Sequence, residues 1–256
     1  MIAVFSGTGN SLYAATLLSS RLGDRIVTYS PDEALPQPAD GRIVWVFPVY
    51  SWGVPPVVEQ WIERTECTHL DHYCVLTCGD DAGLTARQWR RLIESRGGRA
   101  CSVFSVIMPN VYVLMKGFDV DSESVATLKL SRVPARIEDI AQHIAAGEEG
   151  IDDVTRGSFA WIKSRVIYPW FKRYAMSPKP FHATEACTGC GSCARHCPLH
   201  NITMADGRPR WGDRCALCLR CYHQCGSHAV AYGKATEGKG RYLCPTPPTG
   251  RAGARS

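Results

Sequence analysis

The sequence lacks two features of membrane and secreted proteins. It contains no run of the roughly 20 apolar residues that a transmembrane helix requires. Residues 1–5 lead directly into a glycine-rich turn, without the basic region, long apolar run and small-residue cleavage site of a signal peptide. These absences predict a cytoplasmic protein with no transmembrane segment.

Strong charge of either sign is also absent. The formal net charge is +5 over 256 residues, and residues 234–256, with five basic residues and one acidic residue, contribute +4 of it. A short basic end of this kind is typical of a solvated, poorly ordered terminus. We therefore expect no nucleic-acid binding and treat residues 236–256 as a basic C-terminal tail.

The cysteines are not spread along the chain as they are in a disulfide-stapled secreted protein. The chain holds 13 cysteines, and eight of them fall within residues 187–225. In a cytoplasmic chain such a concentration indicates metal or redox chemistry. The eight form two runs of the same spacing, Cys-x2-Cys-x2-Cys-x3-Cys: Cys187, Cys190, Cys193 and Cys197, then Cys215, Cys218, Cys221 and Cys225.

This spacing predicts two [4Fe–4S] clusters with crossed ligands. Two residues between cysteines let a tight loop wrap three thiolates around one cluster, and the fourth cysteine, three residues later, ligates the other cluster. Zinc is the alternative, but two complete runs of the same spacing favour clusters over it. The expected ligand sets are Cys187, Cys190, Cys193 and Cys225 for one cluster, and Cys215, Cys218, Cys221 and Cys197 for the other.

Residues 1–150 alternate between strand-like and helix-like patterns. Apolar, β-branched runs predict strands, and apolar residues at helical spacing predict the helices between them. This alternation is typical of a doubly wound α/β domain whose five-stranded parallel sheet carries helices on both faces. In such sheets the ligand lies beyond the carboxyl ends of the strands. The expected strands are residues 2–5, 25–28, 43–49, 73–77 and 100–107.

A glycine-rich loop follows the first expected strand and opens a helix. Its backbone N–H groups and the positive end of the helix form an anion site. Leu12 replaces the third glycine of the dinucleotide fingerprint, and no lysine follows as in a P-loop. A hydroxyl-rich loop without lysine suits a phosphate monoester and indicates FMN, the alternative being a plain structural turn. The loop consists of Ser6, Gly7, Thr8, Gly9, Asn10 and Ser11.

Two further loops follow the third and fourth expected strands. In the first, Tyr50 and Trp52 are candidates to cover the flavin ring, and the Gly53 backbone to approach its N5 atom. In the second, we expect the backbone to bond the pyrimidine edge of the ring. The alternatives are that Cys78 packs as a small hydrophobe and that Asp80 and Asp81 cap the next helix. The candidates are Pro48, Tyr50, Ser51, Trp52 and Gly53, then Thr77, Cys78, Gly79, Asp80 and Gly83.

A helical linker is expected over residues 151–180. Residues 159–174 mix large apolar residues with four basic ones, a pattern that suits either a membrane-surface helix or a helix that docks one domain on the other. We favour docking, and so expect no membrane-surface contact. Residues 181–235 then form the iron–sulfur domain.

These motifs together resemble a known family. Residues 1–150 resemble flavodoxin, and residues 181–232 look like a bacterial-type two-cluster ferredoxin, a small α+β domain. The combination is similar to the fused flavodoxin–ferredoxin proteins of anaerobic bacteria, which often begin with FSGTGNS, as Phe5 to Ser11 do here. The resemblance implies FMN at the three loops and electron transfer as the activity.

The pairing of cofactors suggests what the protein does. Flavin carries one or two electrons and each cluster carries one. We predict an iron–sulfur flavoprotein that exchanges electrons with a redox partner protein. The alternative is a ferredoxin-fed, FMN-dependent reductase of a small molecule, for which the sequence identifies no catalytic acid or base.

Overall fold

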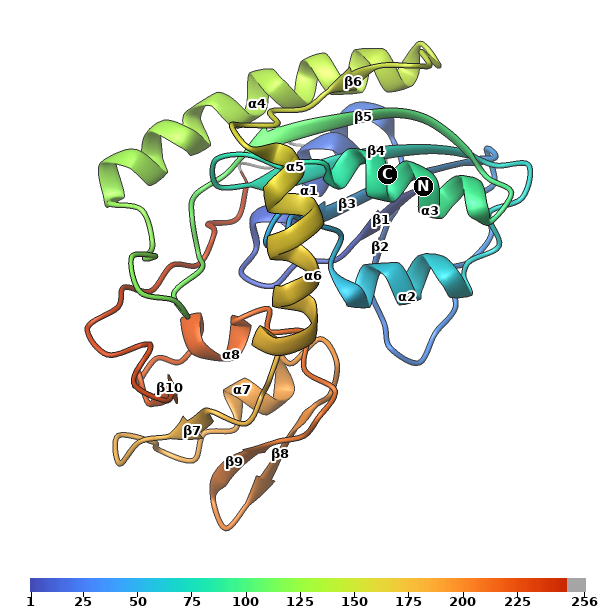
Figure 1. The fold of residues 1–256 in the computed structure, drawn as a ribbon. Coiled ribbons are helices and arrows are strands. Elements are labelled where there is room, and N and C mark those ends of the chain that lie inside the picture. The colour runs from blue at the N-terminus through green and yellow to red at the C-terminus, as the bar shows by residue number, and fades with distance from the viewer. Residues whose placement is uncertain (248–256) are drawn as a thin grey trace, which may run out of the picture.

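The N-terminal half is built on a parallel sheet. The computed structural model describes residues 1–247 and orders the strands β2-β1-β3-β4-β5-β6 (Figure 1). All neighbours are parallel. The order 2-1-3-4-5 is that of flavodoxin-like doubly wound sheets, so the predicted fold class is confirmed. The strands are β1 (Ile2–Val4), β2 (Ile26–Thr28), β3 (Arg42–Pro48), β4 (Asp71–Cys78), β5 (Arg99–Ile107) and β6 (Asp152–Asp153).

Helices cover both faces of this sheet. On one face, α1 (Asn10–Leu22) and α4 (Glu123–Ala145) bury apolar residues against the inner strands. On the other face, α2 (Pro56–Arg64) and α3 (Thr85–Ser95) do the same around Trp45. Burial of these faces supplies most of the stability of such a domain.

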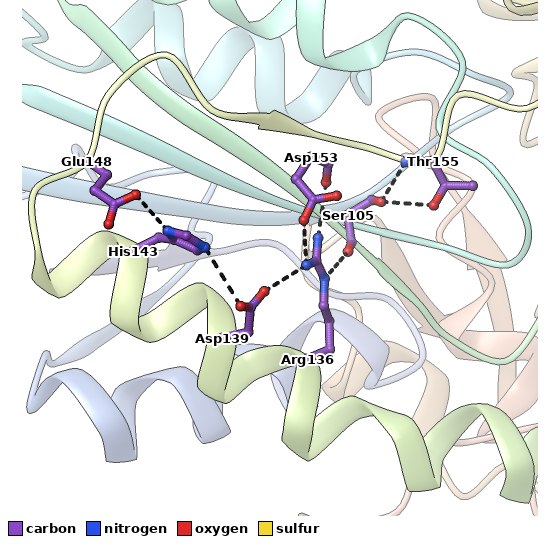
Figure 2. Close-up of polar contacts among 7 residues, drawn as sticks. All are labelled: Ser105, Arg136, Asp139, His143, Glu148, Asp153 and Thr155. Atoms are coloured by element: carbon purple, nitrogen blue, oxygen red, sulfur yellow. Dashed lines mark hydrogen bonds and ion pairs between the residues drawn. The ribbon is translucent and has the colours of Figure 1, made fainter.

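The sixth strand was not expected from the sequence. It lies beyond residue 150, in the segment predicted to be a helical linker, and pairs with β5 at Val103 and Phe104. Figure 2 shows why this edge is ordered: Arg136 of α4 donates to the Asp153 carboxylate (2.6 Å) and to the Ser105 carbonyl (3.1 Å). The Ser105 hydroxyl also accepts from the Thr155 backbone N–H at 2.9 Å.

A single helix over residues 160–175 bridges the two halves of the molecule; we call it the bridging helix. It runs through α5 (Ala160–Ile162), η1 (Lys163–Ile167), α6 (Tyr168–Trp170) and η2 (Phe171–Ala175), the two η segments having π-helical bonding. Ser164, Tyr168 and Phe171 form its buried face. This face is bonded to the α/β half at the Trp52 and Val54 carbonyls.

The C-terminal half is a small α+β unit. Strands β7 (Phe181–Ala183) and β10 (Val230–Tyr232) pair antiparallel, and β8 (Ile202–Ala205) and β9 (Arg208–Trp211) form a hairpin. Two one-turn helices, α7 (Ser192–Arg195) and α8 (Arg220–His223), each contain the third cysteine of a run. Figure 1 shows this unit below the sheet, at the far end of the bridging helix.

The first part of the expected tail is packed rather than solvated. The Gly240 backbone N–H donates to the Asp119 carboxylate at 2.9 Å, and the Lys239 ammonium donates to the Phe118 carbonyl at 2.7 Å. The Arg241 guanidinium lies 3.8 Å from the centre of the Tyr222 ring. The rest of the predicted tail, residues 248–256, lies outside the described residues.

Within residues 1–247, no helix is both long enough and apolar enough to cross a membrane.

One buried histidine makes the sheet sensitive to acid. His72 is fully buried; its Nδ1 accepts from the Trp45 indole at 3.0 Å, and its Nε2 donates to the Cys67 carbonyl at 3.2 Å. Burial lowers the pKa of His72, which keeps the ring neutral in the folded protein. Protonation would convert Nδ1 to a donor and break the bond from Trp45.

We expect the free energy of unfolding to fall as the pH drops below about 6.5, the unfolded pKa of histidine, because the unfolded chain then binds an additional proton. The His72→Gln variant should be less stable than the unchanged protein at neutral pH. Its free energy of unfolding should also fall less steeply between about pH 6.5 and pH 5. Urea unfolding across this range measures both. An unchanged slope in the variant would assign the acid sensitivity to other groups.

Candidate functional site

The glycine loop lies where the sequence predicts, between β1 and α1. Gly9 caps the helix with φ of 106°, a conformation that a residue with a side chain rarely adopts. The Ser11 hydroxyl lies 2.7 Å from the Thr77 hydroxyl at the end of β4, and the Asn10 amide donates to the Pro109 carbonyl at 2.8 Å. The loop is therefore held against the ends of the neighbouring strands.

The same loop presents unused hydrogen-bond donors. Among residues 1–247, the backbone N–H groups of Gly7, Thr8, Gly9 and Asn10 have no hydrogen-bond partner. The Ser6 hydroxyl is buried and equally unpartnered. Buried donors normally find acceptors, and these surround the positive end of α1. The loop therefore fits a phosphate group, as the sequence predicts for FMN.

The loop after β3 is strained. Pro48, the last residue of β3, lies beside Thr77 of β4, so the two predicted ring-binding loops leave the sheet at the same edge. Ser51 and Trp52 have φ of 44° and 63°, which is costly for residues with side chains and recurs at functional sites. Tyr50 points into the molecule beside the Phe5 ring, with 6.5 Å between ring centres.

The Gly53 N–H already has a hydrogen-bond partner, and its expected approach to the flavin N5 atom stays a prediction. This N–H donates to the Tyr50 carbonyl at 2.9 Å. A side chain at this position would also overlap the Tyr168 ring of the bridging helix. Trp52 likewise packs toward that helix, with the Lys163 ammonium 4.9 Å from its ring centre. Of Tyr50 and Trp52, Tyr50 is the one that lies beside Phe5, directly before the glycine loop.

Some residues of the loop after β4, but not all, are packed or bonded within the protein. Cys78 is buried, and burial raises its pKa to about 12, so it is a packed thiol. Gly79 lies under the Asn110 side chain, and Gly83 lies against Trp52 and Ser164. Asp80 is exposed, whereas Asp81 accepts from the Gly83 N–H at 3.2 Å and pairs with Lys163 at 2.6 Å.

The spacing predicts two crossed groups of cysteines, and the structure places several members of each group near one another. Burial raises the pKa of Cys193, and the nearby Cys225 and Cys187 raise it further; Cys225 also lies beside Cys190. In the second group burial raises the pKa of Cys215 to about 12, and Cys218 and Cys197 add to it. Cys197 likewise lies beside Cys218 and Cys221. Ligation of iron by these groups stays a prediction.

The second cysteine group encloses a space that bears on what it could bind. Among residues 1–247, no three His, Cys, Asp or Glu side chains are close enough to hold one metal ion. The second group instead lines a cavity, together with residues such as Phe181 and Trp211. The Trp211 indole N–H is buried without a partner in hydrogen-bond geometry and lies beside Cys221. Four thiols with a nearby indole N–H are compatible with an iron–sulfur cluster, which the spacing of the cysteines predicts.

The backbone around the two groups repeats. The second run lies 28 positions after the first, and positive φ recurs at matched residues: Gly189 with Leu217, and Gly191 with Leu219. After the fourth cysteines, the Asn201 N–H donates to the Cys197 sulfur at 3.4 Å, and the Ala229 N–H donates to the Cys225 sulfur at 3.2 Å. Backbone donors aimed at the sulfurs are a feature of iron–sulfur sites.

The second cysteine group packs directly on the glycine loop. A side chain at Gly7 would overlap the Cys218 carbonyl. Arg220 donates to the Gly7 carbonyl at 2.6 Å and to the Ser6 carbonyl at 3.3 Å. Burial, and then the nearby Cys218 and Cys215, raise the pKa of Tyr50 well above its usual value. The predicted flavin site and one predicted cluster site therefore share an interface.

Sequence reasoning missed the residues that close this site. Arg220 approaches the loop from the other half of the chain, and no local pattern marks its partner. The C-terminal segment also reaches the loop: the Cys244 N–H donates to the Thr8 carbonyl at 2.9 Å, and the Cys244 side chain lies against Gly9. The described part of the tail thus covers the outer side of the predicted phosphate site.

Replacing Gly7 tests the shared interface. Gly7→Ala places a methyl group into the Cys218 carbonyl, and overpacking of this kind typically costs about 1–3 kcal/mol. We expect a lower thermal midpoint and faster proteolysis between residues 150 and 180.

Gly226→Ala is the matched control, because nothing lies within 4 Å of a side chain there. Equal midpoints for the two variants would contradict the close packing at Gly7.

Comparisons with known proteins agree with parts of this picture. Residues 181–203 match the 4Fe-4S binding domain family (Fer4), so the chain contains a [4Fe–4S]-binding domain around the first cysteine run. No curated protein matches the chain.

Three solved structures illustrate the likeness of the N-terminal half. Flavodoxin from Streptococcus pneumoniae TIGR4 is 15% identical over 57% of this chain and 95% of its own, with a TM-score of 0.37. Fusobacterium nucleatum flavodoxin bound to flavin mononucleotide is 13% identical over 58% and 96%, with a TM-score of 0.37. An NAD(P)H:quinone oxidoreductase from Methanothermobacter marburgensis is 12% identical over 54% and 92%, with a TM-score of 0.30. At these values the fold assignment rests on the strand order.

Proposed function

We propose that this protein is a cytoplasmic iron–sulfur flavoprotein that transfers electrons between a redox partner protein, two [4Fe–4S] clusters and FMN. The observation that carries the proposal is the packing of the second cysteine group on the glycine loop, through Cys218, Gly7 and Arg220. FMN would supply a centre that takes one or two electrons, and the clusters one-electron steps.

The residues around the phosphate cradle support FMN over a dinucleotide. The unpartnered Ser6 hydroxyl and the free N–H groups of Gly7 to Asn10 suit one phosphate. Cys244 covers the outer side of Gly9. Arg220 adds positive charge near a loop that has no lysine of its own, although its donors bond loop carbonyls rather than the cradle itself.

One exposed cysteine supports an order for the predicted redox centres. Cys190 of the first group is exposed, whereas the other seven cysteines of the two runs are only partly exposed. The first group would therefore exchange electrons with the partner. The second group, beside Tyr50 and Gly7, would exchange them with the flavin.

The ligand assignment is tested by iron analysis of protein prepared without oxygen. We expect about eight iron and eight sulfide per chain, as two such clusters require. Cys225→Ser should remove the cluster of Cys187, Cys190 and Cys193 and spare the other, as EPR of the reduced protein will show.

Cys244→Ser is the control, because Cys244 belongs to neither group, and it should retain all the iron. Zinc in place of iron, or loss of the other cluster in Cys225→Ser, would contradict the assignment.

The phosphate site is tested by comparing two flavins. Ser6→Ala removes a donor aimed at the expected phosphate, and a hydrogen bond to a charged group contributes about 1.5–3 kcal/mol. We expect FMN affinity to fall roughly tenfold or more, while riboflavin, which lacks the phosphate, binds the variant and the unchanged protein equally. Fluorescence titration measures both. If the variant and the unchanged protein bind FMN equally well, the Ser6 hydroxyl does not bond the phosphate.

A further inference from the structure

The bridging helix leaves a large apolar surface uncovered. Its side chains that face away from Ser164, Tyr168 and Phe171 are mostly aromatic or aliphatic, and we call them the outer face. Soluble proteins rarely expose so many large apolar residues together unless the patch has a binding role. The outer face consists of Phe159 (75% exposed), Trp161 (63%), Ile162 (48%), Val166 (53%), Ile167 (38%), Trp170 (54%) and Tyr174 (65%).

These residues form a stripe along the helix. Ile162, Val166, Trp170 and Tyr174 are spaced by four, so they succeed one another on one side of the helix. The Trp170 and Tyr174 rings lie 6.3 Å apart. Figure 1 shows the helix in front of the other elements, on the outside of the molecule. The stripe is therefore continuous and accessible.

The charge around the stripe has one sign. Residues 154–184 contain six basic residues and no acidic residue. Lys163 pairs with Asp81, and Lys172 pairs with Glu59, which fixes the helix to the α/β half. Among residues 1–247, Arg165 and Arg173 form no ion pair, and both are exposed. The outer face thus combines apolar side chains with unneutralised positive charge.

This charge decides what covers the stripe. In a symmetric pair of copies, each outer face would bring its own Arg165 and Arg173 toward those of the other, so like charges would meet. Residues 248–256 hold no large apolar side chain to cover it. The partner must offer apolar material and negative charge together.

We propose that the outer face binds reversibly to the surface of membranes that contain anionic lipids. Interfacial helices combine Trp, Phe and aliphatic side chains on one side with Lys and Arg beside them. Trp and Tyr favour the depth of the lipid headgroups, and arginines gain from the negative surface potential. The inner face stays docked through Ser164, Tyr168 and Phe171, so the helix attaches without leaving the protein.

The proposal goes beyond the proposed electron transfer and does not depend on it. It revises the choice made from sequence, where docking and membrane contact were alternatives. We assign docking to the inner face of the helix and membrane contact to its outer face. One such helix, with no lipid anchor, gives weak and salt-sensitive attachment.

Vesicle flotation with the full-length protein tests the proposal. We expect the protein to float with phosphatidylcholine vesicles that contain phosphatidylglycerol, to float at least tenfold less with phosphatidylcholine alone, and to detach as salt rises. The double variant Trp161→Ala/Trp170→Ala should lose roughly tenfold or more of the binding to anionic vesicles. Arg165→Gln/Arg173→Gln should lose the preference for anionic lipid.

Val125→Ser/Leu128→Ser is the matched control, because both residues are exposed and apolar but lie on α4 (41% and 52% exposed). It should bind vesicles like the unchanged protein, and circular dichroism should confirm that every variant is folded. Absence of flotation with anionic vesicles, or equal loss in the control, would overturn the proposal. A concentration-dependent dimer that the Trp161→Ala/Trp170→Ala variant abolishes, without vesicle binding, would assign the face to a second copy instead.

Discussion

The contact between the Cys218 backbone and Gly7 is the constraint on which the rest of the site depends. It is possible only because Gly7 has no side chain, and the Arg220 guanidinium holds it by donating to the Gly7 and Ser6 carbonyls. It joins the loop after β1 to the second cysteine run. A predicted phosphate site and a predicted cluster site therefore become neighbours, although they are more than 200 residues apart along the chain.

The cysteine unit supports this contact through its own repetition. Matched residues of the two runs take up left-handed backbone, with glycines in the first run and Leu217 and Leu219 in the second. Such a conformation costs of order 1–3 kcal/mol for a residue with a side chain. The buried Leu217 and Leu219 pack with Val113 and Tyr222, which offsets that cost. The second run is thus the one bound into the body of the protein, and the first remains nearer to solvent.

The bridging helix adds a second link and a second surface. Its inner side chains bind both predicted ring loops: the Ser164 hydroxyl donates to the Trp52 carbonyl and accepts from the Leu84 N–H, each at 2.8 Å. On the outer face of the same helix, Trp161 and Trp170 are exposed to solvent. Exposing two tryptophans beside unpaired arginines is hard to reconcile with a linker that only joins two domains.

Much of the fold followed from local patterns. A helix was predicted directly after the glycine loop, and α1 begins there at Asn10. The five main strands were expected within about two residues. Strand β6 was missed because Asp152 and Asp153 have no strand-like character, and their pairing depends on Arg136 of α4 and on β5. The packing of Tyr168 on Gly53 was not foreseen for a similar reason, since Tyr168 comes from a distant part of the chain.

The sequence by itself determined the chemistry of each motif: the spacing of eight cysteines, the hydroxyls and glycines of the loop, and the alternation of a doubly wound sheet. These depend on neighbours along the chain, where spacing sets geometry. Only the tertiary structure decided which cysteine group meets the glycine loop, that Arg220 and Cys244 close it, and that one side of the bridging helix stays open. Such choices depend on shape and charge between segments far apart in sequence, and no local pattern carries that information.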